Sequence, residues 1–346
     1  KGFLPRGISQ GTQSCAVKGT FFFLPSKKDD PVIMTYSPGT SVWGTIAIPD
    51  SVPVLQMLDG VSLVGVSSTD PGTSDFLVVS GGRTKNVVVY DIQNKKWFNA
   101  PGMDHAQANT CTVSCRGYWF SMTGDFTKSN SIGKRQLKPK NRRVYRYNLT
   151  SGERLENSAK KQRGGAACGC DEAANRVFWA GGFSDSGLTD NIGVWGADPL
   201  HRGGEPIFKL SSPKRDLGGT VCGSLFAVVG GTSKKSAQAT IDIYMANATA
   251  SGESYLTLEL NSSVISPKVE CLKKRYVIIS GGDIDGKTLN NDIQWFDSQN
   301  LPQKGAMIAT LTAPLNLTGD IMSATDSSSG AVMFFDGQRG EILAPL

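Results

Sequence analysis

One pattern constrains the fold of this chain more than any other feature: short apolar, β-branched or aromatic runs that end at a glycine pair or a turn. Two glycines after a buried strand allow the positive φ angles of a sharp turn. The turns are marked by Pro25, Gly81, Gly124, Gly181, Gly230, Gly281 and Asp336. Seven units of about fifty residues therefore fill the chain and leave no room for a second domain.

The order within a unit is also regular. In the second unit, Gly81-Gly82 precedes an alternating strand at 86–91, a polar turn at 94–96 and the aromatic pair Trp97-Phe98. Four strands per unit at this period predict an all-β fold, a single β-propeller over residues 1–346. The expected blades span 9–52, 60–101, 105–158, 163–212, 215–262, 266–313, and 318–346 together with 1–8.

The last of these blades is expected to close the ring, because the N-terminal segment 1–8 would supply the strand that residues 318–346 lack. Three units lack the glycine pair: the first has Leu24-Pro25, the third keeps only Gly124, and the seventh has Asp336-Gly337. Seven blades are expected, and a count of six stays open.

The units resemble the kelch-repeat family of β-propellers. The resemblance rests on Gly81-Gly82 with Tyr90 and Trp97, Gly181-Gly182 with Trp195, Gly230-Gly231 with Tyr244, and Gly281-Gly282 with Trp295. The chain also resembles the kelch-like propeller of the galactose oxidase superfamily, without its copper ligands. That oxidase needs two histidines and two tyrosines on one copper, whereas His105 and His201 are the only histidines here and need not converge. The resemblance implies partner binding through loops on one face. Because no catalytic motif is found and only two histidines are present, no catalytic residue, metal or cofactor is expected.

Seven cysteines fall in the strand before each apolar run, which kelch propellers place innermost. They are either buried small hydrophobic residues or disulfides between adjacent blades. Cys111 and Cys115 cannot bond each other, since four residues at about 3.3 Å each exceed disulfide reach. Any bridge must therefore cross between blades, for example from the third to the fourth or from the fifth to the sixth. The candidates are Cys111, Cys115, Cys168, Cys170, Cys222 and Cys271, and the odd count leaves a free thiol.

The strongest charge feature lies within the third unit. The candidate partner-binding residues of this basic loop are Lys128, Lys134, Arg135, Lys138, Lys140, Arg142 and Arg143. Long insertions between strands project from a propeller face, where binding loops usually lie. The expected partner is a protein with an acidic surface; an anionic glycan, acidic lipid headgroups or a merely solvated loop are the alternatives. Interleaved aromatic residues are too few to predict nucleic-acid binding.

The Ser-, Thr- and Gly-rich loops and the missing initiator Met favour a secreted or extracellular chain, including the ectodomain of an anchored protein. Candidate N-glycosylation acceptors are Asn148, Asn247, Asn261 and Asn316, each in an Asn-x-Ser/Thr sequon. No apolar run is long enough to predict membrane insertion in this segment. Asp283, Asp285, Asn290, Asn291 and Asp292 resemble part of a calcium loop, but an ordinary Asp-Gly turn fits them better because the bidentate glutamate is absent.

These observations predict a non-enzymatic extracellular scaffold that engages another protein through loops on one face, such as a secreted effector or an ectodomain in a larger complex. The alternatives are a lectin-like propeller that binds carbohydrate and a diverged propeller of the copper-radical-oxidase type.

Overall fold

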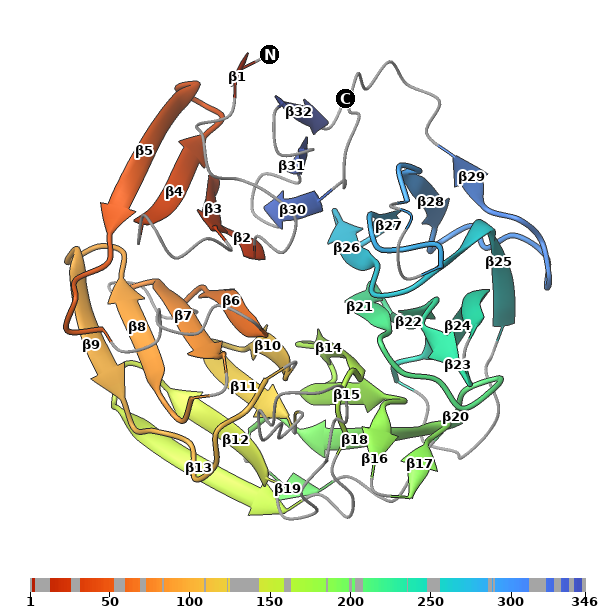
Figure 1. The fold of residues 1–346 in the computed structure, drawn as a ribbon, viewed down its shortest axis with the longest axis horizontal. Helices are drawn as coiled ribbons and strands as arrows, with labels where there is room; N and C mark the ends of the chain where they lie inside the picture. The colour runs from red at the N-terminus through yellow and green to blue at the C-terminus, as the bar shows by residue number, and fades with distance from the viewer. Residues whose placement is uncertain are drawn as a thin grey trace.

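The computed structural model describes residues 2–3, 13–25, 32–52, 60–68, 73–82, 84–108, 110–122, 124, 143–158, 163–184, 186–198, 201–202, 208–234, 236–247, 256–285, 288, 290–310, 322–326, 331–335 and 339–343. Every regular element within these residues is a β-strand. The strands pair antiparallel and form sheets arranged around a common centre, as the sequence repeat predicted (Figure 1).

The first three blades each contain four strands in sequence order. The first contains β2 (Gln13–Val17), β3 (Thr20–Leu24), β4 (Val32–Ser37) and β5 (Val42–Ala47). The second contains β6 (Val61–Val66), β7 (Phe76–Gly81), β8 (Val87–Asp91) and β9 (Lys96–Ala100). The third contains β10 (Cys111–Cys115), β11 (Tyr118–Met122), β12 (Arg143–Asn148) and β13 (Glu153–Ser158).

The fourth and fifth blades are less regular. The fourth contains β14 (Ala167–Asp171), β15 (Arg176–Ala180) and β18 (Asn191–Gly196), with β19 (His201–Arg202) and β20 (Phe208–Lys209) both paired to β18. A hairpin of β16 (Phe183–Ser184) and β17 (Gly187–Leu188) is inserted in it. The fifth contains β21 (Gly218–Cys222), β22 (Leu225–Val229), β24 (Ser236–Met245) and β25 (Leu256–Val264), with β23 (Thr232–Ser233) beside β24.

The sixth blade and the closing sheet complete the ring. The sixth blade contains β26 (Lys268–Leu272), β27 (Tyr276–Ser280), β28 (Gln294–Asp297) and β29 (Ala309–Thr310). The closing sheet contains β30 (Met322–Asp326), β31 (Ala331–Phe335), β32 (Arg339–Leu343) and, from the other end of the chain, β1 (Gly2–Phe3). Gly2 pairs with Gly340 and Phe3 with Arg339, so the N-terminal segment contributes the outer strand.

The two termini therefore meet in one composite sheet (Figure 1). Its inner strand β30 contacts both β26 of the sixth blade and β2 of the first. Six blades are continuous in sequence, whereas this sheet is assembled from both ends of the chain. The structure thus has six blades that are continuous in sequence, one fewer than the seven expected, and the composite sheet is a seventh sheet of the ring.

Packing between blades explains the apolar runs. All six residues of β7 are buried, because the middle strands are covered on both faces by neighbouring blades. The outer strand β9 is only partly covered. The glycine pairs have the backbone geometry that the sequence indicated: φ is +66° at Gly181 and +100° at Gly182. A Cβ atom on Gly181 would lie 2.7 Å from the Lys214 carbonyl oxygen, so the close approach of the next blade also requires glycine.

Antiparallel order gives the ring two different faces. We call the side where the second strand of each blade ends the loop face; it carries the connections 82–86, 101–110, 123–142, 159–166, 181–190, 210–217 and 281–293. We call the opposite side the turn face; it carries 18–19, 116–117, 149–152, 172–175, 223–224 and 273–275. The inner strands β2, β6, β10, β14, β21, β26 and β30 contact one another in that order around the centre.

Candidate functional site

The basic loop of the sequence analysis leaves the third blade on the loop face. It connects β11, which ends at Met122, to β12, which begins at Arg143, so twenty residues join the two strands. Six of the seven candidate binding residues lie outside the described residues: Lys128, Lys134, Arg135, Lys138, Lys140 and Arg142. Arg143 is described, and it shows how the loop is anchored.

Arg143 belongs to a group of two arginines and two carboxylates at the base of the loop. Its guanidinium lies 3.3 Å from a Glu156 carboxylate oxygen and 3.9 Å from an oxygen of Asp104. Arg154 on β13 contacts the same two acids, at 3.3 Å from Asp104 and 3.4 Å from Glu156. Two positive and two negative charges therefore neutralise one another where the loop joins β12.

The side chain of Tyr145 contacts two members of this group. The Tyr145 hydroxyl accepts a hydrogen bond of 3.1 Å from the backbone N–H of Asp104, and the Arg154 guanidinium lies 5.5 Å from the Tyr145 ring. Burial alone would lower the pKa of Arg154, but Tyr147, Asp104 and Glu156 raise it overall. Arg154 thus stays a cation that holds the connection 101–110 against the outer strand of the blade. Partly exposed ion pairs contribute about 0–1 kcal/mol each, so the group adds little to the stability of the fold.

Two arginines at and beyond the end of the basic segment, Arg143 and Arg146, are already paired with carboxylates. Arg143 is occupied by the pairs above, and Arg146 on β12 is buried and bonded to Asp198 at 2.6 Å. Between positions 127 and 142 there are six lysines and arginines and no acidic residue. The formal net charge of the chain is +6, so the rest of the chain sums to 6 − 6 = 0. The whole net charge of the protein is therefore carried by this one segment.

Two disulfides fix the third blade to the fourth. Cys111 pairs with Cys168 and Cys115 with Cys170, with Cα–Cα distances of 5.8 Å and 5.6 Å. Both bridges join the inner strands β10 and β14, and a third bridge, Cys222–Cys271, joins β21 to β26. The hypothesis of bridges from the third to the fourth blade and from the fifth to the sixth is confirmed. The alternative that most of these cysteines are unpaired small hydrophobic residues is wrong.

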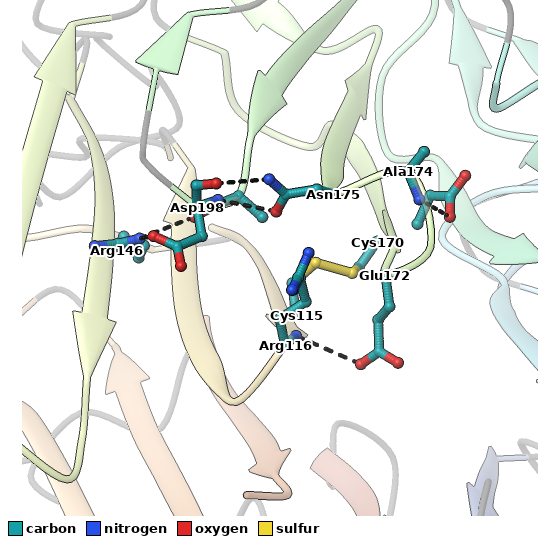
Figure 2. Close-up of a disulfide and its surroundings, with 10 residues drawn as sticks. Cys115, Arg116, Arg146, Cys170, Glu172, Ala174, Asn175 and Asp198 are labelled. Atoms are coloured by element: carbon teal, nitrogen blue, oxygen red, sulfur yellow. Dashed lines mark hydrogen bonds and ion pairs between the residues drawn. A yellow bond between two sulfur atoms is a disulfide. The ribbon is translucent and has the colours of Figure 1, made fainter. Parts of the chain in front are cut away.

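Polar contacts reinforce the same boundary on the turn face. Figure 2 shows the Cys115–Cys170 bridge beside a hydrogen bond of 3.4 Å from the Arg116 N–H to Glu172. Asp198 exchanges two hydrogen bonds with the Asn175 side chain and accepts one from Arg146 (Figure 2). The Arg146 guanidinium also lies 4.3 Å from the centre of the Tyr118 ring. The blade that carries the basic segment is therefore joined to its neighbour by covalent and polar contacts.

Cys15 is the free cysteine among the described residues, as the odd count required. It lies on the inner strand β2 and is partly exposed. Burial raises the pKa of its thiol to about 12, an effect that Lys268 opposes and Glu270 reinforces. The thiol is therefore protonated at neutral pH and a poor nucleophile.

The two histidines are not brought together. His105 lies in the connection 101–110 on the loop face, whereas His201 pairs with Gly196 at the turn-face end of β18. In the segment that resembles part of a calcium loop, Asp285 accepts hydrogen bonds from the Thr288 N–H and hydroxyl, and Asn290 is buried. Within the described ranges, no three histidine, cysteine, aspartate or glutamate side chains group as metal ligands.

Three of the four candidate glycosylation acceptors are described. Asn148 ends β12, Asn247 follows β24 in an exposed turn, and Asn261 lies within the outer strand β25; Asn316 is outside the described residues. Asn148 and Asn247 are both on the turn face. No helix in the described part of the chain is long and apolar enough to cross a membrane.

Several residues of the site gave no sequence signal. Asp104, Arg154, Glu156 and Asp198 are isolated charges in polar stretches, and only the pairing of strands brings them together. Register offers a partial signal, since Tyr145 pairs with Glu156 and Tyr147 with Arg154 once β12 and β13 are aligned.

Comparison with known proteins supports the fold and nothing finer. No protein-family model and no curated protein matches the sequence. A solved structure described as "Structure of YjhT" superposes with a TM-score of 0.59 over 89% of this chain and 99% of that chain, at 13% sequence identity. At this identity the likeness shows the fold alone, so membership of the kelch family stays a prediction.

Proposed function

We propose that this chain is a kelch-type, non-enzymatic extracellular scaffold that binds a protein partner with an acidic surface through the loop face. The observation that carries the proposal is the difference between the two faces of the third blade. Its turn-face connections span two residues (116–117) and four residues (149–152). Its loop-face connections span ten (101–110), twenty (123–142) and eight (159–166). Long connections on a rigid framework are where binding residues concentrate.

Charge gives the proposal its partner class. The segment 127–142 contains six lysines and arginines and no acidic residue, so its positive charge is not neutralised within the segment. Such a segment attracts an acidic surface and speeds its encounter in a salt-dependent way. The neutral group of Asp104, Arg143, Arg154 and Glu156 fixes the segment's base, so less ordering is required there on binding.

Three disulfides are consistent with an extracellular location, where such bonds persist. A fully oxidised protein isolated from the extracellular medium, with only Cys15 reactive after unfolding, is the expected result. Recovery of reduced protein from its native setting would contradict the extracellular part of the proposal.

The binding experiment replaces Lys134, Arg135, Lys138, Lys140, Arg142 and Lys128 by alanine and measures capture of proteins from the native extracellular medium at several salt concentrations. We expect wild-type capture to weaken as salt rises, and the variant to lose both affinity and salt dependence. The matched control replaces the exposed turn-face residues Lys273 and Lys274, which leaves the basic segment intact. Equal capture by the six-residue variant and wild type would remove the segment from the mechanism.

Heparin and phosphatidylserine vesicles serve as probes for the alternative partners. Protein capture that depends on the six cations, without comparable binding to these two probes, supports the proposal. Binding to heparin or vesicles without protein capture would reassign the partner to an anionic glycan or to acidic lipid headgroups.

A further inference from the structure

Three strands that occupy the same place in different blades end in the same kind of turn. In the second blade, the Asp91 carboxylate accepts hydrogen bonds from the N–H groups of Gln93 and Asn94, at 3.1 Å and 2.9 Å. In the sixth blade, the Asp297 carboxylate accepts one of 2.9 Å from Gln299. Each acid ends the third strand of its blade and stabilises the turn to the outer strand.

The third blade uses Asn148 in this place. Its side-chain carbonyl oxygen accepts hydrogen bonds from the N–H groups of Thr150 and Ser151, at 3.0 Å and 3.1 Å. The turn therefore uses only the oxygen of the amide, which aspartate supplies equally well in the other two blades. The Asn148 nitrogen, Nδ2, makes no hydrogen bond to the described residues, and Thr150 is exposed. The turn explains an Asx residue here but not the choice of asparagine followed by Thr150.

We propose that Asn148 is a site of N-linked glycosylation. In this reaction Nδ2 attacks the anomeric carbon of a lipid-pyrophosphate-linked oligosaccharide. The new N–C bond replaces the sugar–phosphate bond, the lipid pyrophosphate leaves, and the amide nitrogen gives up one proton. The attached sugar extends from an exposed turn, and the hydrogen bonds of Asn148 Oδ1 remain in place.

Asn261 provides the contrast within the same chain. It lies inside the outer strand β25, its N–H donates a hydrogen bond of 2.8 Å to the Gln294 side chain, and its Nδ2 is bonded to the Thr310 hydroxyl of the sixth blade. A sugar on that nitrogen would break a contact between two blades. Of these two sequons, the structure accommodates the one at Asn148 without loss of a contact.

The position of Asn148 also separates the sugar from the binding segment. Arg143 and Asn148 are the two ends of β12, so the basic loop leaves one end of the strand and the sugar would extend from the other. Five residue steps of about 3.3 Å place these ends about 17 Å apart, on opposite faces of the ring. The inference rests on the extracellular part of the proposed function, because the modification requires passage through the secretory pathway.

The test expresses the whole chain behind a signal peptide in a eukaryotic secretory host. Peptide-N-glycosidase F converts a glycosylated asparagine to aspartate, which peptide mass spectrometry detects. We expect conversion at Asn148 in the wild type and none in Thr150→Ala, which leaves the turn-forming Asn148 in place. Asn148→Asp should also lose the sugar, be secreted, and melt at the same temperature as the unglycosylated Thr150→Ala variant, because Asp91 and Asp297 form this turn in other blades.

Secreted, folded wild type with unmodified Asn148 would overturn the inference, whatever occurs at Asn247 or Asn316. Conversion at Asn261 with none at Asn148 would also overturn it. Because the host supplies the secretory route, these results concern the acceptor site alone. Loss of the proposed extracellular function would instead appear as reduced cysteines in protein from the native source.

Discussion

The buried ion pair between Lys214 and Asp242 gives the sharpest stability prediction. Lys214 lies in the connection before β21, and Asp242 lies on β24 of the same blade. Both side chains have 0% exposure, and Lys214 Nζ is 2.7 Å from a carboxylate oxygen of Asp242 and 2.6 Å from the Thr240 hydroxyl. The other oxygen of Asp242 accepts a hydrogen bond of 3.2 Å from the Ser211 N–H. Lys214→Met would leave the carboxylate with that single partner.

Removal of one member of a buried pair costs about 3–5 kcal/mol, because the remaining charge is uncompensated. Unfolding entropy of about 2.1 cal/mol/K per residue gives about 0.7 kcal/mol/K for a chain of this length if it unfolds in one transition. The expected fall in Tm is therefore about 4–7 °C. The double variant Lys214→Met, Asp242→Leu should recover most of this loss, since apolar replacement of a whole buried pair is often close to neutral.

The assay is a double-mutant cycle by calorimetry, with denaturant unfolding as a second measure. Lys209 and Asp190 provide the matched control, because their charged atoms are 3.8 Å apart and the Lys209 side chain is 63% exposed. Lys209→Met should change the free energy of unfolding by about 0–1 kcal/mol. The reasoning is refuted if Lys214→Met costs as little as Lys209→Met, or if the double variant is less stable than either single variant.

Three further predictions concern the inner strands. Replacing Cys115 and Cys170 by alanine should cost about 2–3 kcal/mol, because Cys111–Cys168 still closes a long loop that overlaps the one lost. Removing both bridges should cost about 6–7 kcal/mol in non-reducing calorimetry, and equal costs for the two variants would contradict this reasoning. Cys15, with its pKa raised to about 12, should react with iodoacetamide at pH 8 about a thousandfold more slowly than an ordinary thiol until the protein unfolds, whereas fast labelling of the native protein would contradict the raised pKa. Burial raises the pKa of Glu270, so the folded state binds this proton more tightly than the unfolded state does, and the free energy of unfolding falls as pH rises through the folded pKa. Glu270→Gln should remove this fall when Tm is measured against pH. Parallel Tm–pH curves for the variant and the wild type would contradict this prediction.

The sequence predicted the fold best at positions where only one residue type satisfies the local geometry, such as the glycine pairs and the bridging cysteines. The glycine pairs at 181–182, 230–231 and 281–282 all have positive φ, and the cysteines of β10 and β14 could only bond across blades. The sequence also predicted that the N-terminal segment completes the last sheet, because the last unit lacked a strand and residues 1–8 belonged to no unit.

The candidate site was only partly readable, because charge alone does not reveal partners. Arg143 was predicted to belong to the partner-binding loop, yet it is paired with Asp104 and Glu156, and the nearby Arg146 is bonded to Asp198. Lys214 and Asp242 are 28 residues apart and have no pattern in common, so nothing local indicates that they form a buried pair. Long-range ion pairs depend on tertiary register, which a single sequence does not specify.

The pairing of β1 with β32 determines when the ring can be completed during synthesis in the cell. The composite sheet is complete only when Gly2 and Phe3 meet Arg339 and Gly340, which are synthesised more than 330 residues later. At about 5–20 residues per second, the N-terminal strand waits about 17–70 s for its partner. During that interval β2, the inner strand of the first blade, lacks its neighbour β30, and the incomplete ring exposes an apolar blade surface. Chaperone dependence is therefore expected to be concentrated in this final step, although the six continuous blades can form earlier.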